Sequence, residues 1–245
     1  NSSYNDLEST ITPANANQLA LAADFTVDTG TPYTDTISTS IVSVGGILYF
    51  GSWNGYEYAV NAQTYQVLWK QFLGTDTPPA SQNCSPSTVG VASNATIVNG
   101  VLYVGGGDGN MYALDTTNGG AIIWKTQVAT PPNEFLWGSP AIGNGHVYIG
   151  ISSFGDCPLI HGRVDMLDQA TGAILAIHQT TTNHNVGNSV WSKIALDPMT
   201  GTVIYDTGNG STADLENDAI VMLDWNTLAV EPNGIFQIPL ADQQT

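Results

Sequence analysis

Basic side chains are scarce in this chain of 245 residues. Four Lys and Arg stand against 21 Asp and Glu, so the formal net charge at neutral pH is −17. An acidic surface of this kind repels the phosphates of nucleic acids and the head groups of anionic lipids. The composition therefore argues against nucleic acid and membranes as partners, and it favours solubility in an extracellular medium.

Long hydrophobic runs are also missing. No apolar run approaches the roughly 20 residues that a membrane helix needs, so we expect no membrane-spanning helix. No stretch of about 12 residues shows convincing 3.6-residue periodicity, and we therefore expect no long helix either. Because 42% of the residues are hydrophobic, residues 1–245 can form one large globular β domain.

Cysteine occurs only twice, at Cys84 and Cys157, and the first residue is Asn1 instead of an initiator Met. We expect a processed, secreted protein, in which the two cysteines either form a disulfide or remain free thiols. The Asn-x-Ser/Thr sequons that accept N-linked glycans begin at Asn1, Asn83, Asn94 and Asn209. We expect glycosylation at Asn83 and Asn94.

What the chain does contain is an internal repeat. The segment VLYVGGGDGNMYALDTTNGGAIIWK, residues 101–125, overlays VGGILYFGSWNGYEYAVNAQTYQVLWK, residues 44–70. Four pairs match at one offset of 54 positions: Gly46 with Gly100, Tyr49 with Tyr103, Gly55 with Gly109, and Tyr58 with Tyr112. Trp69 matches Trp124 with one residue of slip. Agreement at a fixed offset indicates a repeated structural unit.

Two further copies of the unit follow, each interrupted once. Their parts are residues 143–150 with 162–177, and residues 200–210 with 218–230. The insertions, residues 152–161 and 211–217, fall at the same turn of the unit in both copies. This placement predicts loops gathered on one face of the molecule.

Each unit indicates four short antiparallel strands. Runs rich in Val, Ile, Leu and Tyr are bounded by Asn-Gly, Asp-Gly or Thr-Gly turns. Four strands in a unit of this length are typical of a propeller blade, whereas an unrelated β-sandwich does not explain the constant spacing. We predict an all-β propeller with about four blades, near residues 38–75, 88–130, 137–180 and 188–240. Aspartates recur at one blade position, which favours turn capping over catalysis: Asp115, Asp168 and Asp224.

The repeat resembles that of pyrroloquinoline quinone (PQQ) propellers, as in quinoprotein alcohol dehydrogenases and polyvinyl-alcohol-dehydrogenase-like proteins. It is carried by Gly100, Leu102, Tyr103, Gly105, Gly109, Tyr112, Ala113, Leu114, Asp115, Gly119 and Trp124. The resemblance covers most of the chain and implies half of an eight-bladed propeller. It implies that an outer-strand tryptophan packs on the glycine-rich turn of the next blade, which we assign to Gly105–Gly109. Residues 19–30 are similar to the last strand of each unit, as in residues 67–76, so we expect residues 1–37 to hold an entry segment and a spare outer strand.

The same resemblance implies three site residues. The segment VWSKIALDPMTGTVIYDTGN, residues 190–209, matches a family segment in which a tryptophan stacks on the quinone and an asparagine binds calcium. By this match Trp191 is the stacking residue and Asn209 a calcium ligand, and Asp156 is the candidate for the acidic calcium ligand. The alternatives are a structural role for Trp191 and a left-handed turn at Asn209.

Two family features have no match in this sequence, namely an adjacent pair of cysteines and the catalytic Asp of the C-terminal half. We therefore assign no catalytic residue. The sequence favours a secreted propeller that binds a flat aromatic or quinone-type ligand in its central funnel, as a chromoprotein does. The alternatives are a PQQ- and calcium-dependent alcohol oxidoreductase, and a non-catalytic interaction or carbohydrate-binding scaffold. Pairing of two chains into an eight-bladed ring is expected, because a half-propeller leaves sheet faces and edges uncovered.

Overall fold

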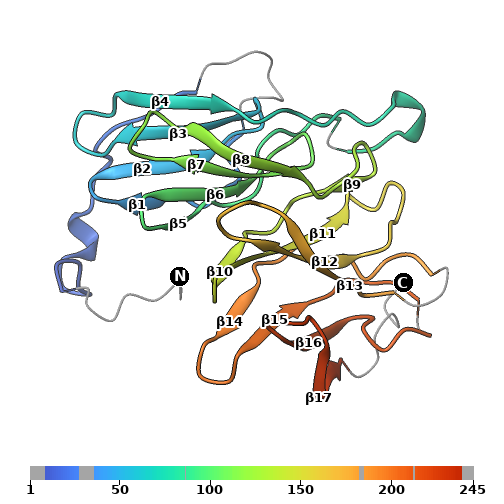
Figure 1. Cartoon of the computed structure of the whole chain (residues 1–245). Coiled ribbons are helices and arrows are strands. Elements are labelled where there is room, and N and C mark those ends of the chain that lie inside the picture. Colours follow the sequence, from blue (N-terminus) through green and yellow to red (C-terminus); the bar gives the residue numbers. More distant parts are fainter. Residues whose placement is uncertain (1–8, 28–35, 86, 182–184, 212, 239–245) are drawn as a thin grey trace.

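The chain folds into four successive four-stranded antiparallel sheets, as seen in a computed structural model that describes residues 9–27, 36–85, 87–181, 185–211 and 213–238 (Figure 1). Blade 1 comprises β1 (Val42–Val44), β2 (Ile47–Gly51), β3 (Tyr56–Asn61) and β4 (Val67–Phe72). Blade 2 comprises β5 (Thr96–Val98), β6 (Val101–Gly105), β7 (Asn110–Asp115) and β8 (Ala121–Gln127). Blade 3 comprises β10 (Ala141–Gly143), β11 (His146–Ser153), β12 (Arg163–Asp168) and β13 (Ile174–Gln179). Blade 4 comprises β14 (Ala195–Asp197), β15 (Thr202–Asp206), β16 (Ala219–Asp224) and β17 (Val230–Gln237).

Three short elements lie outside this pattern. Two are single-turn 3-10 helices, η1 (Ala16–Gln18) and η2 (Ala80–Gln82). The third is the two-residue strand β9 (Glu134–Phe135), which pairs with the end of β11. The prediction of an all-β propeller of about four blades is confirmed. In the described part of the chain no helix is long and apolar enough to cross a membrane.

The first hairpin of blades 1 to 3 is closed by a two-residue turn in which both residues have positive φ. In blade 2 these residues are Asn99 (φ 50°) and Gly100 (φ 80°), and in blade 3 they are Asn144 (φ 53°) and Gly145 (φ 76°). Turns of this kind match the right-handed twist of the two strands they connect, and Asn-Gly is their preferred sequence. The local sequence therefore sets the register of the hairpin.

The turn before the outer strand is capped by a side chain. In blade 3, Oδ1 of Asp168 accepts hydrogen bonds from the backbone N–H and the hydroxyl of Thr171. In blade 4, Oδ1 of Asp224 accepts the same two bonds from Thr227. Asp115 of blade 2 caps its turn through Thr117 in the same way. The predicted capping role of these aspartates is confirmed.

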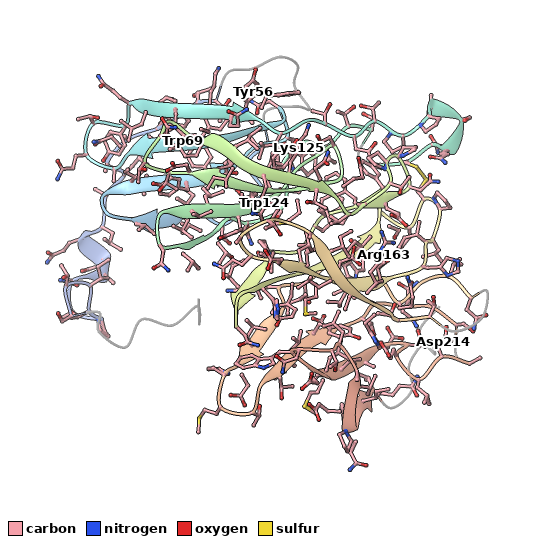
Figure 2. The ribbon with its side chains drawn as sticks, in the orientation of Figure 1. Tyr56, Trp69, Trp124, Lys125, Arg163 and Asp214 are labelled. Carbon is pink, nitrogen blue, oxygen red and sulfur yellow. A yellow bond between two sulfur atoms is a disulfide. The ribbon has the colours of Figure 1, made fainter. Side chains whose placement is uncertain are left out.

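Neighbouring blades pack face to face, and Trp69 and Trp124 lie on the outer strands of blades 1 and 2 (Figure 2). Each of these indoles lies on a glycine of the next blade. A Cβ added to Gly120 would lie 2.6 Å from Cε3 of Trp69, and a Cβ added to Gly172 would lie 2.6 Å from Cε3 of Trp124. The indole Nε1 of Trp124 donates to the carbonyl of Gln169 at 3.1 Å. Glycine is required at these turns because any side chain would displace the indole.

The assignment of the docking glycines to Gly105–Gly109 was therefore wrong. Positions in this turn lie against backbone: a Cβ on Gly107 would lie 2.4 Å from the carbonyl oxygen of Gly74 and 2.8 Å from that of Gly90. The turn thus fits between the end of blade 1 and the linker that leads into blade 2. The indoles dock on the turn that precedes the outer strand.

The two ends of the row of blades differ. At the first end, the N-terminal segment covers blade 1: Phe25 makes edge contacts with Phe50 and Tyr58, and Val27 is buried in the same cluster. Val27 thereby takes the place on blade 1 that Leu73 of blade 1 takes on blade 2. Residues 19–27 pair with no other described strand, so the segment fills the position of a spare outer strand without forming one.

At the last end, blade 4 exposes an apolar face. Ile220 of β16 is 44% exposed, whereas Val164, at the same position in blade 3, is fully buried by blade 4. Closure of a ring through a second chain would bring this face to blade 1, where Val27 already occupies part of the contact surface. The pairing of two chains stays a prediction.

Three of the buried carboxyl groups have raised pKa values. Glu57 is fully buried, Asp165 is 1% exposed and Asp76 is 3% exposed. Burial raises the pKa of Glu57 well above its usual value and that of Asp76 to about 6. Burial also raises the pKa of Asp165 to about 7, because the cost of removing its charge from water exceeds the opposing effect of Arg163, 3.3 Å away; the negative charge of Glu134 adds to the rise. These groups favour the folded state when they are protonated.

The glycine in the docking turn can be tested against its neighbour. Gly119 and Gly120 both have positive φ, but a Cβ on Gly119 meets nothing within 4 Å. The variants Gly119→Ala and Gly120→Ala should each lower the free energy of unfolding by about 1 kcal/mol, because alanine is strained at positive φ. Only Gly120→Ala places a methyl group against the indole of Trp69. We therefore expect the free energy of unfolding of this variant, measured in urea, to fall by a further ~1–3 kcal/mol. Equal losses in the two variants would contradict the docking role.

The buried carboxyls predict a stability that falls as pH rises. A group whose pKa is raised in the folded state loses its stabilising contribution as pH increases from its unfolded pKa through its folded pKa. For Asp165 this window runs from 3.8 to about 7. Urea unfolding across this range should show a decreasing free energy, and Asp165→Asn should flatten the slope. Asp168→Asn is the control, because this exposed carboxylate has a lowered pKa; an unchanged slope in Asp165→Asn would refute the assignment.

Candidate functional site

The four inner strands line a groove with a volume of about 910 Å³. The linkers that lead into these strands lie at one end of it. At that end three loops of blades 3 and 4 are joined by hydrogen bonds around Ser189: the N–H of Ser153 donates to Ser189 Oγ at 3.1 Å, and the N–H of Gly208 donates to the Ser189 carbonyl at 3.0 Å. We call residues 153–156, 187–191 and 208–210 the loop cluster. It carries all three predicted site residues, namely Asp156, Trp191 and Asn209.

Trp191 is the exposed aromatic residue of the loop cluster. Its side chain is 44% exposed and lies over Gly208, where an added Cβ would come within 2.8 Å of Nε1. The backbone of Gly208 thus supports one face of the indole and leaves part of it accessible. An accessible indole on a fixed backbone can stack on a flat ligand.

Trp191 has a counterpart in blade 3 that the sequence comparison missed. Trp137 lies 54 positions earlier, also just before the inner strand of its blade. Its Nε1 donates to the carbonyl of Ser153 at 3.1 Å, and its ring lies 4.7 Å from that of Phe135. Trp137 is therefore a structural residue, whereas Trp191, at the same position, remains exposed. The repeat offset of 54 was the signal that could have found this pair.

Asp156 closes its own turn. It is exposed, has φ of 58°, and its Oδ1 accepts a hydrogen bond from Ser153 Oγ at 2.7 Å. Asn209 is exposed as well, and its carbonyl accepts from the N–H of Asn188 at 2.9 Å. The left-handed turn offered as the alternative for Asn209 was wrong, because Asn209 is not among the residues with positive φ, whereas Asn188, its hydrogen-bond partner, has φ of 52°.

The oxygen atoms of the loop cluster fall short of a calcium site. Calcium takes about six to eight oxygen ligands. In the cluster Asp156 supplies the carboxylate, and it is engaged by Ser153. Across the described residues no three His, Cys, Asp or Glu side chains gather in a way that could hold a metal ion. Asn188 Oδ1 is buried without a hydrogen-bond partner among the described residues, but it adds only one oxygen. These side chains do not make a complete calcium site.

A disulfide anchors the loop that carries Asp156. Cys84, in the linker between blades 1 and 2, is bonded to Cys157 with a Cα–Cα distance of 5.7 Å. Cys84 also packs against an aromatic cluster that contains Phe135 and Phe154. The bond thus ties the β11–β12 loop to a linker 73 residues earlier in the chain.

The two predicted glycosylation sites differ in their surroundings. Asn83 is exposed, in a left-handed conformation beside Cys84, and glycosylation there stays a prediction. The amide of Asn94 is engaged at both ends: Oδ1 accepts from the N–H of Ser40 at 2.5 Å, and Nδ2 donates to Ser139 Oγ at 2.9 Å. A glycan on Asn94 would break this bridge between three blades, so the structure disfavours it.

One polar cluster escaped the sequence analysis. Glu216, in the insertion of blade 4, accepts hydrogen bonds from Nε2 of His178 and from the hydroxyl of Tyr205, each at 2.9 Å. Burial, together with the charge of Glu216, raises the pKa of Tyr205. The cluster holds the insertion onto blade 3. No sequence spacing pointed to it, because His178 and Glu216 lie on different blades.

Comparisons with known proteins agree with the fold. A family model described as "Outer membrane protein assembly factor BamB" matches residues 34–233. The chain is 27% identical over 202 residues to the dehydrogenase subunit of alcohol dehydrogenase (quinone) from Gluconacetobacter polyoxogenes, covering 69% of this chain and 27% of that protein. It is 26% identical over 193 residues to polyvinylalcohol dehydrogenase from Pseudomonas sp, covering 69% of this chain and 29% of that protein.

A solved structure of a europium-containing methanol dehydrogenase superposes with a TM-score of 0.73 at 20% identity, covering 94% of this chain and 46% of that one. At this identity the likeness shows the fold alone. The chain spans less than a third of the length of the two curated relatives.

The disulfide should make a large contribution to stability. Closing a loop of this length restricts the unfolded chain, and we expect the double variant Cys84→Ser, Cys157→Ser to lose about 2–4 kcal/mol of unfolding free energy in urea. The control is the unaltered chain after reduction by dithiothreitol, which should lose a similar amount. Unchanged unfolding of both samples would show that the bond does not constrain the loop.

Proposed function

Since the chain belongs to the PQQ-type repeat family described as outer membrane protein assembly factor BamB, we propose that it binds a flat aromatic or quinone-type ligand at the loop cluster of blades 3 and 4. The observation that carries the proposal is the exposed indole of Trp191, which is held over Gly208 at the end of the central groove. An apolar surface with a few polar groups around it is the usual form of a small-molecule site.

The class of ligand is supported by the relatives. Two of the matching proteins are named alcohol dehydrogenase (quinone), dehydrogenase subunit, and polyvinylalcohol dehydrogenase. Stacking on an indole suits any flat conjugated ring system, including a quinone or a pigment. A protein that binds a coloured ligand of this kind and catalyses no reaction on it is a chromoprotein. We propose that it acts in a secreted, acidic setting, in keeping with its net charge of −17.

Binding is favoured over a complete dehydrogenase for a geometric reason. The carboxylate of the loop cluster, Asp156, is exposed and tied to its own turn by Ser153. A general base must reach the proton it abstracts, and nothing in the described loop cluster places Asp156 over the indole of Trp191. The alternative is a PQQ- and calcium-dependent alcohol oxidoreductase, and the joint placement of Trp191 and Asn209 on the loop cluster is the observation in its favour.

The absorption spectrum of the purified chain tests the proposal, followed by titration with PQQ in the presence and absence of a calcium chelator. We expect binding that resists the chelator and quenches tryptophan emission. Trp191→Ala should weaken it by roughly tenfold through loss of the stacking contact, whereas Trp191→Phe, which keeps a ring, should retain most of it.

Two other results would change the conclusion. Binding that the chelator abolishes, together with oxidation of alcohols, would favour the oxidoreductase. A spectrum of protein alone, with no response to PQQ or to other flat aromatic ligands, would refute the proposal and leave a scaffold without a cofactor.

A further inference from the structure

We infer that Glu216 is a positioning residue for the loop cluster, because it holds the backbone on which the indole of Trp191 lies. Glu216 belongs to the connection between β15 and β16, which Asp214 marks in Figure 2, and it is 8% exposed. The inference rests on the function proposed above, since the position of the indole matters for stacking on a ligand. The link between the two residues is nevertheless testable without any ligand.

The carboxylate of Glu216 joins blades 3 and 4. Its Oε1 lies 2.9 Å from Nε2 of His178, which belongs to the outer strand β13 of blade 3. Its Oε2 accepts a hydrogen bond from the hydroxyl of Tyr205 at 2.9 Å, on β15 of blade 4. Both oxygens are therefore engaged, and a buried carboxylate that is held at both oxygens is fixed in place.

The backbone of Glu216 continues this connection to the loop cluster. Its carbonyl accepts a hydrogen bond from the hydroxyl of Thr207, and the N–H of Thr207 donates to the carbonyl of Ala219 at 2.9 Å. The next residue along the chain is Gly208, whose carbonyl accepts from the N–H of Asp218 at 3.3 Å. The two ends of the β15–β16 connection are thus held side by side, and Gly208 lies at their junction.

Gly208 is the support of the indole. A Cβ added to it would lie 2.8 Å from Nε1 of Trp191 and 3.3 Å from Cε2, so the ring lies directly on this backbone. The counterpart Trp137 is held differently, by a hydrogen bond from Nε1 to the carbonyl of Ser153 and by contact with the ring of Phe135. The position of Trp191 therefore depends on the β15–β16 connection. A functional side chain needs such a supporting shell to keep its orientation.

A matched control lies at the other end of the same contact between blades 3 and 4. His178 pairs with Val164 near the start of β12, whereas His146 pairs with Asp168 at the end of that strand. Nδ1 of His146 lies 3.2 Å from the hydroxyl of Tyr148, and this hydroxyl donates to the carbonyl of Trp225. Each end of the contact thus has a histidine and a tyrosine that connect it to a different tryptophan.

Fluorine NMR of the chain labelled with fluorotryptophan tests the positioning in the absence of ligand. The variants Trp191→Phe and Trp225→Phe assign the two resonances. We expect Glu216→Ala to shift the Trp191 resonance and to leave the Trp225 resonance in place, because it removes the bonds that hold the β15–β16 connection. His146→Ala should have the reverse effect.

Two further variants separate positioning from a loss of folding. Glu216→Gln keeps the shape and one acceptor oxygen, so the Trp191 resonance should stay near its original position. His178→Ala removes one of the two side-chain bonds and should shift this resonance less than Glu216→Ala, which provides a reading where Glu216→Ala does not fold. Titration with PQQ should show an affinity about threefold lower in Glu216→Ala, a part of the loss expected for removing the ring, and no change in His146→Ala.

Three results would overturn the inference. The first is a Trp191 resonance that stays in place in both Glu216→Ala and His178→Ala. The second is an equal shift of the Trp191 and Trp225 resonances in Glu216→Ala, which would show a general loosening of the two blades. The third is an equal loss of PQQ affinity in Glu216→Ala and His146→Ala. If the resonances shift as expected but the unaltered chain does not respond to PQQ, the positioning stands and the ligand proposed above fails.

Discussion

The contact of one blade with the next is the interaction on which the rest of this structure depends. A four-stranded sheet has two faces, and blades 2 and 3 bury theirs against neighbours in continuous apolar clusters. The indoles of Trp69 and Trp124 fix the spacing at two of these contacts, because each lies on a glycine that has no side chain to interfere. At the third contact Ala176 takes the tryptophan position, and Trp225, from a turn of blade 4, packs on the same core. The packing of the blades on one another also sets the positions of the loops at the end of the groove.

Much of the fold could be predicted because its signals are local. Asn-Gly turns, alternating apolar residues and aspartate-capped turns each act within about ten residues, and the repeat offset links one unit with the next. The docking glycine was misplaced for the opposite reason. The turn at Gly105–Gly109, before β7, and the turn at Gly119–Gly120, after β7, are both rich in glycine. The sequence does not say which of the two turns contacts the tryptophan of the neighbouring blade. That depends on the direction in which the blades stack, which is a property of contacts between distant residues.

The candidate site shows the same division. Trp191 and Asn209 came from a resemblance between segments, and the structure places them on joined loops. Hydrogen bonds around Ser189 join these loops, and one of them connects residues 36 positions apart in the chain. No pattern in the sequence predicts these bonds. Asn94 looked like a glycan acceptor because a sequon is a local signal, whereas its bridge spans 54 residues to Ser40 and 45 to Ser139. Polar residues that connect blades are therefore the ones that sequence reasoning assigns least well.

Val27 has a consequence for the solution behaviour of the chain. It sits in the socket on blade 1 that Leu73 occupies on blade 2, while blade 4 presents a free apolar face at the other end. Copies of a repeat unit with two complementary ends would join head to tail into open fibres. With the socket of blade 1 already filled from within the same chain, the two ends no longer match. The N-terminal segment thus covers the face of blade 1 on which another copy of the unit would otherwise pack.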